Sequence, residues 1–210
     1  EAVIFDLDGT LLYTLPDMAV AVNSVLSAHG HPTHRTEEYR PMVGWGLFET
    51  MRNALPEDHR EDDVVAPLAE ELYIKYRETM AEHTVPYEGI PTLLDTLSDR
   101  GIPFCVLSNK EHSFAVEVVR KTLGKWRFTE VQGRTGEIPA KPDPTGARAM
   151  VSRMKVSPEH VLYVGDSAVD METAVRAGLY PAGVLWGYRD KREIETAGAK
   201  SLFSSPEELL

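Results

Sequence analysis

Short apolar runs alternate with stretches of helical periodicity along most of the chain. The apolar runs have the length of buried strands and lie at 2–5, 103–108, 128–131, 161–164 and 182–186. Helical patterns follow these runs at 91–100, at 113–123, after 141–144 and at 168–177. Short strands that alternate with helices are typical of a parallel sheet covered by helices on both faces. The pattern therefore predicts an α/β fold with a doubly wound parallel sheet.

One long segment interrupts this alternation, because it contains helical patterns and no strand. A helix with a proline in its first turn begins the segment, and further helices are indicated at 47–55 and 62–80. The alternation resumes after "VPYEGIP". We therefore expect an α/β core made of residues 1–13 and 87–210, with a helical cap domain of residues 14–86 inserted into it.

Composition narrows the class of protein. Of the 210 residues, 42% are hydrophobic and 26% are charged, as in an ordinary soluble globular protein. No apolar tract is long enough to cross a bilayer and no basic and apolar leader precedes the first strand, so we expect a cytoplasmic protein without a membrane partner. The net charge of −11, without a basic stripe, argues against nucleic acid as a partner. The single cysteine, Cys105, is expected to be a buried structural thiol.

Polar side chains gather at the carboxyl ends of the predicted strands. The motif "DLDGT" places Asp6 and Asp8 two positions apart where a buried strand meets a glycine turn, so both carboxylates share one small space. Similar polar groups come later in the chain: Ser108 and Asn109 in "LSNK", Lys141 in "KPDP", and Asp166 and Asp170 in "GDSAVD". Ligands of open α/β sheets bind at the carboxyl ends of the strands. We therefore expect these residues to form one site.

The residue types in this expected site indicate phosphate chemistry with a divalent cation. Close carboxylates that are partly desolvated repel one another and require a cation, a proton or hydrogen-bond donors nearby. Several carboxylates and a backbone carbonyl form an oxygen-rich site that suits Mg²⁺. Ser108, the backbone N–H of Asn109 and the ammonium group of Lys141 are groups that hold a phosphoryl group. One aspartate, Asp6 at the strand end, can then attack in line while Asp8 hands a proton to the leaving oxygen.

The motifs "DLDGT", "LSNK", "KPDP" and "GDSAVD", in this order, resemble the four motifs of the haloacid dehalogenase superfamily of phosphatases. The resemblance covers essentially the whole chain, including a helical cap inserted directly after the first motif. The stretches "SNK", "PYEG" and "AGLYPAGVLWGY" are similar to the phosphoglycolate phosphatase branch. The resemblance implies a Rossmann-like core, Mg²⁺ as the cofactor, and a small phosphomonoester, foremost 2-phosphoglycolate, as the substrate.

The resemblance also implies a role for each motif residue. Asp6 is expected to be the nucleophile that forms an aspartyl-phosphate, and Asp8 the general acid and base. Ser108 and Lys141 would bind the phosphoryl group. The implied metal ligands are Asp6, the backbone carbonyl of Asp8, Asp166 and, directly or through another ligand, Asp170.

Several alternatives remain open within and outside this superfamily. Asp8 argues against the dehalogenating and phosphonate-cleaving relatives, which lack this second acid. A sugar-phosphate mutase or phosphatase, a pyrophosphatase and a nucleotidase all remain possible. Tyr13 departs from the acid that many relatives have at this position, which leaves the substrate more open than the chemistry. The alternative outside enzymes is a silent phosphate-binding module, which would be expected to lose at least one of the motif residues.

Substrate specificity is expected to lie in the inserted helices. Gly44, Trp45 and Gly46 predict a flexible aromatic loop, and Arg52, about two helical turns further on, is the nearest cation for a substrate carboxylate. Hinges at both ends of the cap would let this loop close over the strand ends and exclude water. The alternative is that Trp45 packs inside the cap. The sequence leaves the oligomeric state open.

Overall fold

The structure is a computed structural model that describes residues 1–210. The chain forms two compact units, one made of residues 1–13 and 86–210 and the other of residues 14–85. We call them the core unit and the helical unit. The second division lies at 85/86, whereas the sequence pattern placed it at 86/87.

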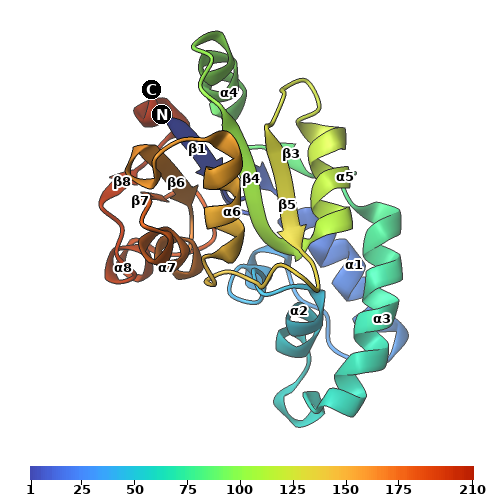
Figure 1. Ribbon diagram of the computed structural model, residues 1–210. Coiled ribbons are helices and arrows are strands. Elements are labelled where there is room, and N and C mark those ends of the chain that lie inside the picture. The colour runs from blue at the N-terminus through green and yellow to red at the C-terminus, as the bar shows by residue number, and fades with distance from the viewer. The chain divides into compact units, whose positions relative to one another are not determined.

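The core unit is built on a six-stranded parallel sheet with the order β5-β4-β1-β6-β7-β8 (Figure 1). The strands are β1 (Ala2–Phe5), β4 (Phe104–Glu111), β5 (Glu130–Arg134), β6 (Val161–Gly165), β7 (Tyr180–Val184) and β8 (Ser201–Phe203). The chain adds strands on one side of β1 first and on its other side afterwards, so the strand order reverses beside β1. Such a reversal is where open α/β sheets bind ligands. The predicted doubly wound α/β fold is confirmed.

Helices cover the sheet of the core unit. They are α4 (Ile90–Asp99), α5 (His112–Thr122), α6 (Thr145–Met154), α7 (Ala168–Ala177) and α8 (Lys191–Thr196), with short 3₁₀ turns at Pro158–His160 and Pro206–Leu209. Helices α6 and α7 contact each other and pack on one face of the sheet, where Ile4, Cys105 and Tyr163 belong to one buried cluster. Each fully buried aliphatic or aromatic side chain stabilises such a layer by roughly 1.5–3 kcal/mol.

The helical unit contains α1 (Leu15–Ala28), α2 (Leu47–Ala54) and α3 (Asp62–Thr79), with 3₁₀ turns at Thr36–Tyr39 and Glu57–His59. Helix α3 packs against both α1 and α2. The fully buried carboxylate of Asp17, in the first turn of α1, accepts backbone N–H bonds from Ala81, His83 and Thr84 at 2.9–3.0 Å. This carboxylate therefore ties the two ends of the helical unit together. Two short strands, β2 (Leu12–Tyr13) and β3 (Val85–Pro86), pair where the chain leaves and re-enters the core sequence.

The structure refines several predicted elements. Strand β4 continues through the polar residues to Glu111, whereas the apolar run predicted an end at Ser108. Strand β5 begins two residues later and β7 two residues earlier than the apolar runs indicated. The sequence pattern did not predict α8 and β8, because six and three residues are too short to show a period. None of the helices combines the length and the apolar character that a membrane span requires.

Candidate active site

The predicted site lies where the three central strands of the core sheet end. Strand β1 pairs with β4 on one side and with β6 on the other, up to Phe5↔Val106 and Phe5↔Val164. Asp6 follows β1 directly, and its backbone N–H donates to the Val164 carbonyl at 2.8 Å. Asp166 follows β6 directly. The parallel register therefore brings residues more than 150 positions apart in sequence to one edge of the sheet.

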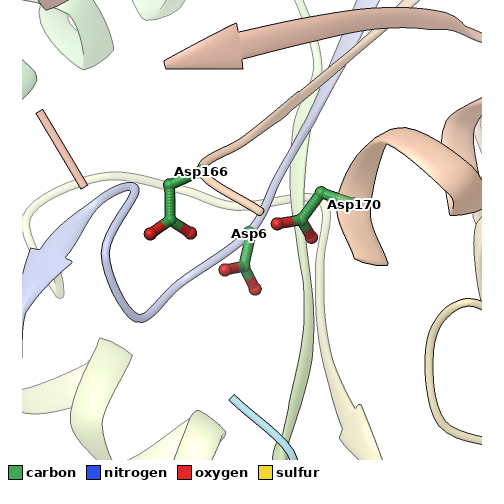
Figure 2. Close-up of side chains that lie close together, drawn as sticks. All are labelled: Asp6, Asp166 and Asp170. Carbon is green, nitrogen blue, oxygen red and sulfur yellow. The ribbon is translucent and has the colours of Figure 1, made fainter. Parts of the chain in front are cut away.

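Three buried aspartates meet at this edge. One carboxylate oxygen from each of Asp6, Asp166 and Asp170 lies within 4.8 Å of the other two. Figure 2 shows Asp6 between the other two, with all three carboxylates turned toward the same space. The site is therefore crowded with like charge in surroundings that water does not screen.

Lys141 is the cation in direct contact with this cluster. Its Nζ donates to Asp6 Oδ1 at 2.6 Å and to Asp170 Oδ1 at 2.7 Å, and its side chain is buried. Burial alone would lower the pKa of Lys141, but the charges of Asp170 and Asp6 outweigh burial and hold this pKa above its ordinary value. One ammonium group thus faces three carboxylates, which leaves an excess of negative charge.

The excess negative charge appears in the acidity of the aspartates. Burial, and next the charge of Asp170, raise the pKa of Asp6 well above its usual range. The same two causes raise the pKa of Asp166 to about 7, although the backbone N–H of Tyr188 opposes them. A divalent cation beside these aspartates would offset both causes, because it would stabilise the ionised form of the carboxylic acids.

Asp166 is held tightly from two sides. Its Oδ2 accepts the backbone N–H of Tyr188 at 2.6 Å. Gly9 has φ +92°, and a Cβ there would lie 2.3 Å from Asp166 Oδ2; a Cβ on Gly187 would lie 2.2 Å from Asp166 Cβ. Glycine is therefore required at both positions, because any side chain would displace this carboxylate. The glycine of "DLDGT" thus has a second use beyond the turn.

Asp170 uses both carboxylate oxygens within the protein. Ser167 begins α7 as its N-cap, and its hydroxyl and backbone N–H donate to Asp170 Oδ2 at 2.6 and 3.2 Å. The other oxygen, Oδ1, accepts from Lys141. These contacts favour a role in which Asp170 orients Lys141, and they leave direct metal ligation as a prediction.

The side chain of Asn109 positions the Lys141 backbone. Asn109 Oδ1 accepts the Lys141 N–H at 2.7 Å, and Asn109 Nδ2 donates to the Lys141 carbonyl at 3.2 Å. This reciprocal pair joins the end of β4 to the loop that carries the lysine. The sequence predicts a role for the backbone N–H of Asn109 alone, so this side-chain role is new in the structure. Ser108, in the same strand, is also buried, and its contact with a phosphoryl oxygen stays a prediction.

A second lysine, Lys110, enters the site beside Asp8. Its Nζ lies 2.9 Å from Asp8 Oδ2, and its side chain is only 5% exposed. The pairing of β4 with β5 changes register between Leu107 and Glu111, and such irregularities redirect side chains next to active sites. This residue lies within "LSNK", but the motif alone predicts no role for it. Only its place directly after Asn109 could have indicated it.

The four residues predicted to select the substrate, Gly44, Trp45, Gly46 and Arg52, lie in the helical unit. Gly44 and Gly46 have φ values of +110° and +94°, and Trp45 between them is 46% exposed. This exposure does not favour the alternative in which Trp45 packs inside the cap. Arg52 donates to the Arg60 carbonyl and to Asp62, both at 2.6 Å. Its role as a carboxylate reader stays a prediction, and it would require Arg52 to leave these partners.

The donor set fits Mg²⁺. The three clustered side chains offer only oxygen atoms, which hard divalent cations prefer, and no histidine or cysteine belongs to the cluster. Burial and the charge of Asp170 raise the pKa of Asp166, so a cation beside it would favour the ionised carboxylate. Asp6 and Asp166 are the side chains best placed to hold the cation, because both oxygens of Asp170 already have partners.

Comparisons with known proteins identify the family of the chain. The sequence model of haloacid dehalogenase-like hydrolases matches residues 3–184. The chain is 33% identical over 214 residues to the N-acetylmuramic acid 6-phosphate phosphatase of Pseudomonas aeruginosa, covering 100% of this chain and 93% of that protein. It is 31% identical over 195 residues to a phosphoglycolate phosphatase of Xylella fastidiosa, covering 92% and 83%. A provisionally named phosphoglycolate phosphatase of Lactobacillus delbrueckii subsp. bulgaricus has a crystal structure that superposes with a TM-score of 0.92 at 26% identity, covering 99% and 95%.

Proposed function

The chain belongs to the haloacid dehalogenase-like hydrolases and is a phosphatase of the phosphoglycolate phosphatase-like branch, and on this premise we propose that it hydrolyses a small phosphorylated acid with Mg²⁺ through an aspartyl-phosphate on Asp6. The observation that carries the proposal is the position of the Asp6 carboxylate. One of its oxygens contacts Lys141 at 2.6 Å, and the same carboxylate belongs to the acidic cluster with Asp166. A carboxylate between an ammonium group and a cation site is arranged to meet a phosphoryl group.

In the proposed reaction, the phosphoryl group replaces water between Asp6 and the donors around it. Lys141 and the Ser108 hydroxyl bind its equatorial oxygens, and an oxygen of Asp6 attacks phosphorus in line. Asp8 donates a proton to the leaving oxygen as the P–O bond of the ester breaks. In the second half, Asp8 takes a proton from a water molecule that attacks phosphorus and releases Asp6.

Mg²⁺ would supply electrostatic neutralisation of the aspartates and of the phosphoryl oxygens when bound. Asp6 and Asp166 would hold it. Asn109 keeps the Lys141 backbone in place, and Asp170 keeps the Lys141 ammonium group directed at Asp6. These contacts fix the geometry before substrate binds, which is what electrostatic catalysis requires.

Two substrates are the leading candidates. Several relatives at 30–34% identity are phosphoglycolate phosphatases, which supports 2-phosphoglycolate. A relative that matches the whole chain is an N-acetylmuramic acid 6-phosphate phosphatase, which supports a phosphorylated sugar acid as the second candidate. Both names denote a phosphate ester of an acid, so a substrate that carries a carboxylate as well as its phosphate is the shared chemistry.

A panel of phosphate esters tests this proposal. The purified protein is assayed with Mg²⁺ for phosphate release from 2-phosphoglycolate, N-acetylmuramic acid 6-phosphate, neutral sugar phosphates, nucleotides and pyrophosphate. We expect the highest kcat/KM for one of the two acids. Conversion of a sugar phosphate to its isomer without phosphate release would indicate a mutase, and no turnover of any ester would contradict the proposed function.

Trp45→Ala is expected to change substrate preference more than stability. If the loop of Gly44, Trp45 and Gly46 contacts the part of the substrate beyond the phosphate, kcat/KM for the best acid should fall by about tenfold or more. The value for p-nitrophenyl phosphate should change much less, because this ester needs few contacts beyond its phosphate. The melting temperature should stay close to that of the parent, since the Trp45 side chain is nearly half exposed.

A matched control is Ile74→Ala, which shortens another exposed apolar side chain of the helical unit. This variant should retain the parental kcat/KM for both esters. Equal losses of Trp45→Ala on both esters, together with a clear drop in melting temperature, would show that Trp45 stabilises the helical unit and does not select substrate.

A further inference from the structure

We propose that Lys110 is a positioning residue that holds the Asp8 carboxylate through Oδ2 and so keeps it in one orientation for both proton transfers. The inference rests on the proposed function, because it assigns a task within the two-step reaction. It follows from two independent features of the site, the burial of the lysine and the state of the two Asp8 oxygens.

The ammonium group of Lys110 is buried and paired with Asp8. The side chain is 5% exposed, and its Nζ lies 2.9 Å from Asp8 Oδ2, whose own side chain is 20% exposed. A buried ammonium group is costly unless it is paired and hydrogen-bonded. Lys110 is therefore placed to keep Asp8 in one orientation, and truncating it would leave that carboxylate free to rotate.

The two oxygens of Asp8 are unequal. Oδ2 meets Lys110, whereas Oδ1 is buried and has no hydrogen-bond partner. Buried polar atoms are nearly always satisfied, so an unpaired carboxylate oxygen in an active site calls for an explanation. No donor at Oδ1 orients this carboxylate, so the contact of Lys110 with Oδ2 is the one that fixes it.

Lys110 is itself fixed by the strand that carries it. Its backbone N–H donates to Ser108 Oγ at 3.1 Å, and the neighbouring Asn109 is locked to the Lys141 backbone. Three consecutive residues at the end of β4 thus serve the phosphoryl group, Lys141 and Asp8. A displaced Lys110 would therefore change the orientation of the Asp8 carboxylate.

The orientation of Asp8 matters in both steps of the reaction. In the first step an oxygen of Asp6 bonds to phosphorus, the ester P–O bond breaks with its electron pair going to the leaving oxygen, and this oxygen takes the proton from Asp8. In the second step the oxygen of water bonds to phosphorus, its proton goes to Asp8, and the bond between phosphorus and Asp6 breaks with its electron pair returning to the Asp6 oxygen. Both transfers need the Asp8 carboxylate within hydrogen-bond reach of the reacting atom.

Rapid-mixing kinetics of Lys110→Met with p-nitrophenyl phosphate and saturating Mg²⁺ test the inference. Nitrophenolate leaves without help from an acid, so Asp6 should still be phosphorylated. Hydrolysis of the intermediate needs Asp8, so one equivalent of nitrophenolate should appear in a burst, followed by a steady rate lowered about 10²-fold. The KM for p-nitrophenyl phosphate should fall together with kcat, so that kcat/KM, which reports the phosphorylation of Asp6, stays near the parental value. For esters with poorer leaving groups, kcat/KM should fall equally with and without a substrate carboxylate, because Lys110 is assigned to Asp8 and not to the substrate.

A double-mutant cycle connects the effect to Asp8. Asp8→Asn should also slow hydrolysis, and the variant that carries both substitutions should be no slower than Asp8→Asn alone, because the two residues act as one unit. Lys125→Met is the control, since Lys125 pairs with Asp95 at 3.0 Å but both side chains are exposed. This control should keep the parental rate and show no burst.

Several outcomes would overturn the inference. They are a parental rate in Lys110→Met, losses that add in the double variant, or a KM increase confined to carboxylate-bearing esters at constant kcat, which would make Lys110 a substrate-binding residue. If Lys110→Met does not fold, Lys110→Gln keeps the length and a donor without the charge, and the same burst is expected. A parent protein that hydrolyses no phosphate ester would contradict the proposed function itself.

Discussion

Asp6→Asn is expected to lower phosphatase activity by at least about 10⁴-fold while the protein remains folded. An amide is a poor nucleophile, and it also removes one oxygen anion from the cation site. The substitution relieves repulsion in a cluster where burial and the charge of Asp170 raise the pKa of Asp6 well above its usual range. The melting temperature of the metal-free variant should therefore be close to that of the parent or above it.

Asp99→Asn provides the matched control, because Asp99 is an exposed aspartate at the end of α4. It should retain parental activity with every ester. Steady-state turnover by Asp6→Asn close to the parental value would remove Asp6 from the mechanism.

Removal of Mg²⁺ is expected to abolish activity, and its return to restore it. With several carboxylates and one directly contacting lysine, the cluster would repel a phosphate dianion when no divalent cation is present. The cation should also raise the melting temperature, because a ligand at 100 times its Kd stabilises the folded state by about 2.7 kcal/mol. Calorimetry with and without Mg²⁺, beside activity in excess chelator, measures both effects.

Asp166→Asn tests whether both effects of the cation arise at the assigned site. The variant should show little Mg²⁺-dependent rise in melting temperature and little activity. Its metal-free form should be no less stable than the metal-free parent, since an amide can still accept the Tyr188 N–H and no longer adds to the negative charge. Full activity in excess chelator, or an unchanged Mg²⁺ effect in Asp166→Asn, would contradict the assigned cation site.

The sequence predicted most of the fold, because the core elements other than α8 and β8 have a clear local signal. The apolar run before Asp6 and the helix that Ser167 begins both lie where the pattern indicated. The family resemblance was equally strong, since four short motifs fell at strand ends in a consistent order. Parallel register then required the motif residues to converge, because strands that pair side by side end at the same edge.

Local sequence patterns did not predict the side-chain contacts of the site. Asn109 was expected to use its backbone, but the loop that returns from β5 brings Lys141 within reach of its side chain. The direction of the Lys110 side chain could not be predicted, because a polar residue near the end of a strand can point to solvent as easily as inward. Arg52 shows the reverse case: its charge suggested a substrate contact, whereas Asp62 and the Arg60 carbonyl already hold it.

The central claim is that the phosphoryl group is carried by Asp6, and one measurement tests it most directly. The protein is mixed with substrate and Mg²⁺, quenched in acid within a single turnover, and its peptides are examined by mass spectrometry. We predict that the peptide containing "DLDGT" gains the mass of one phosphoryl group on Asp6, that the gain is larger in Asp8→Asn with an activated ester, and that it is absent in Asp6→Asn. Phosphate release at the parental rate with no phosphorylated Asp6 at any time during turnover would contradict the mechanism.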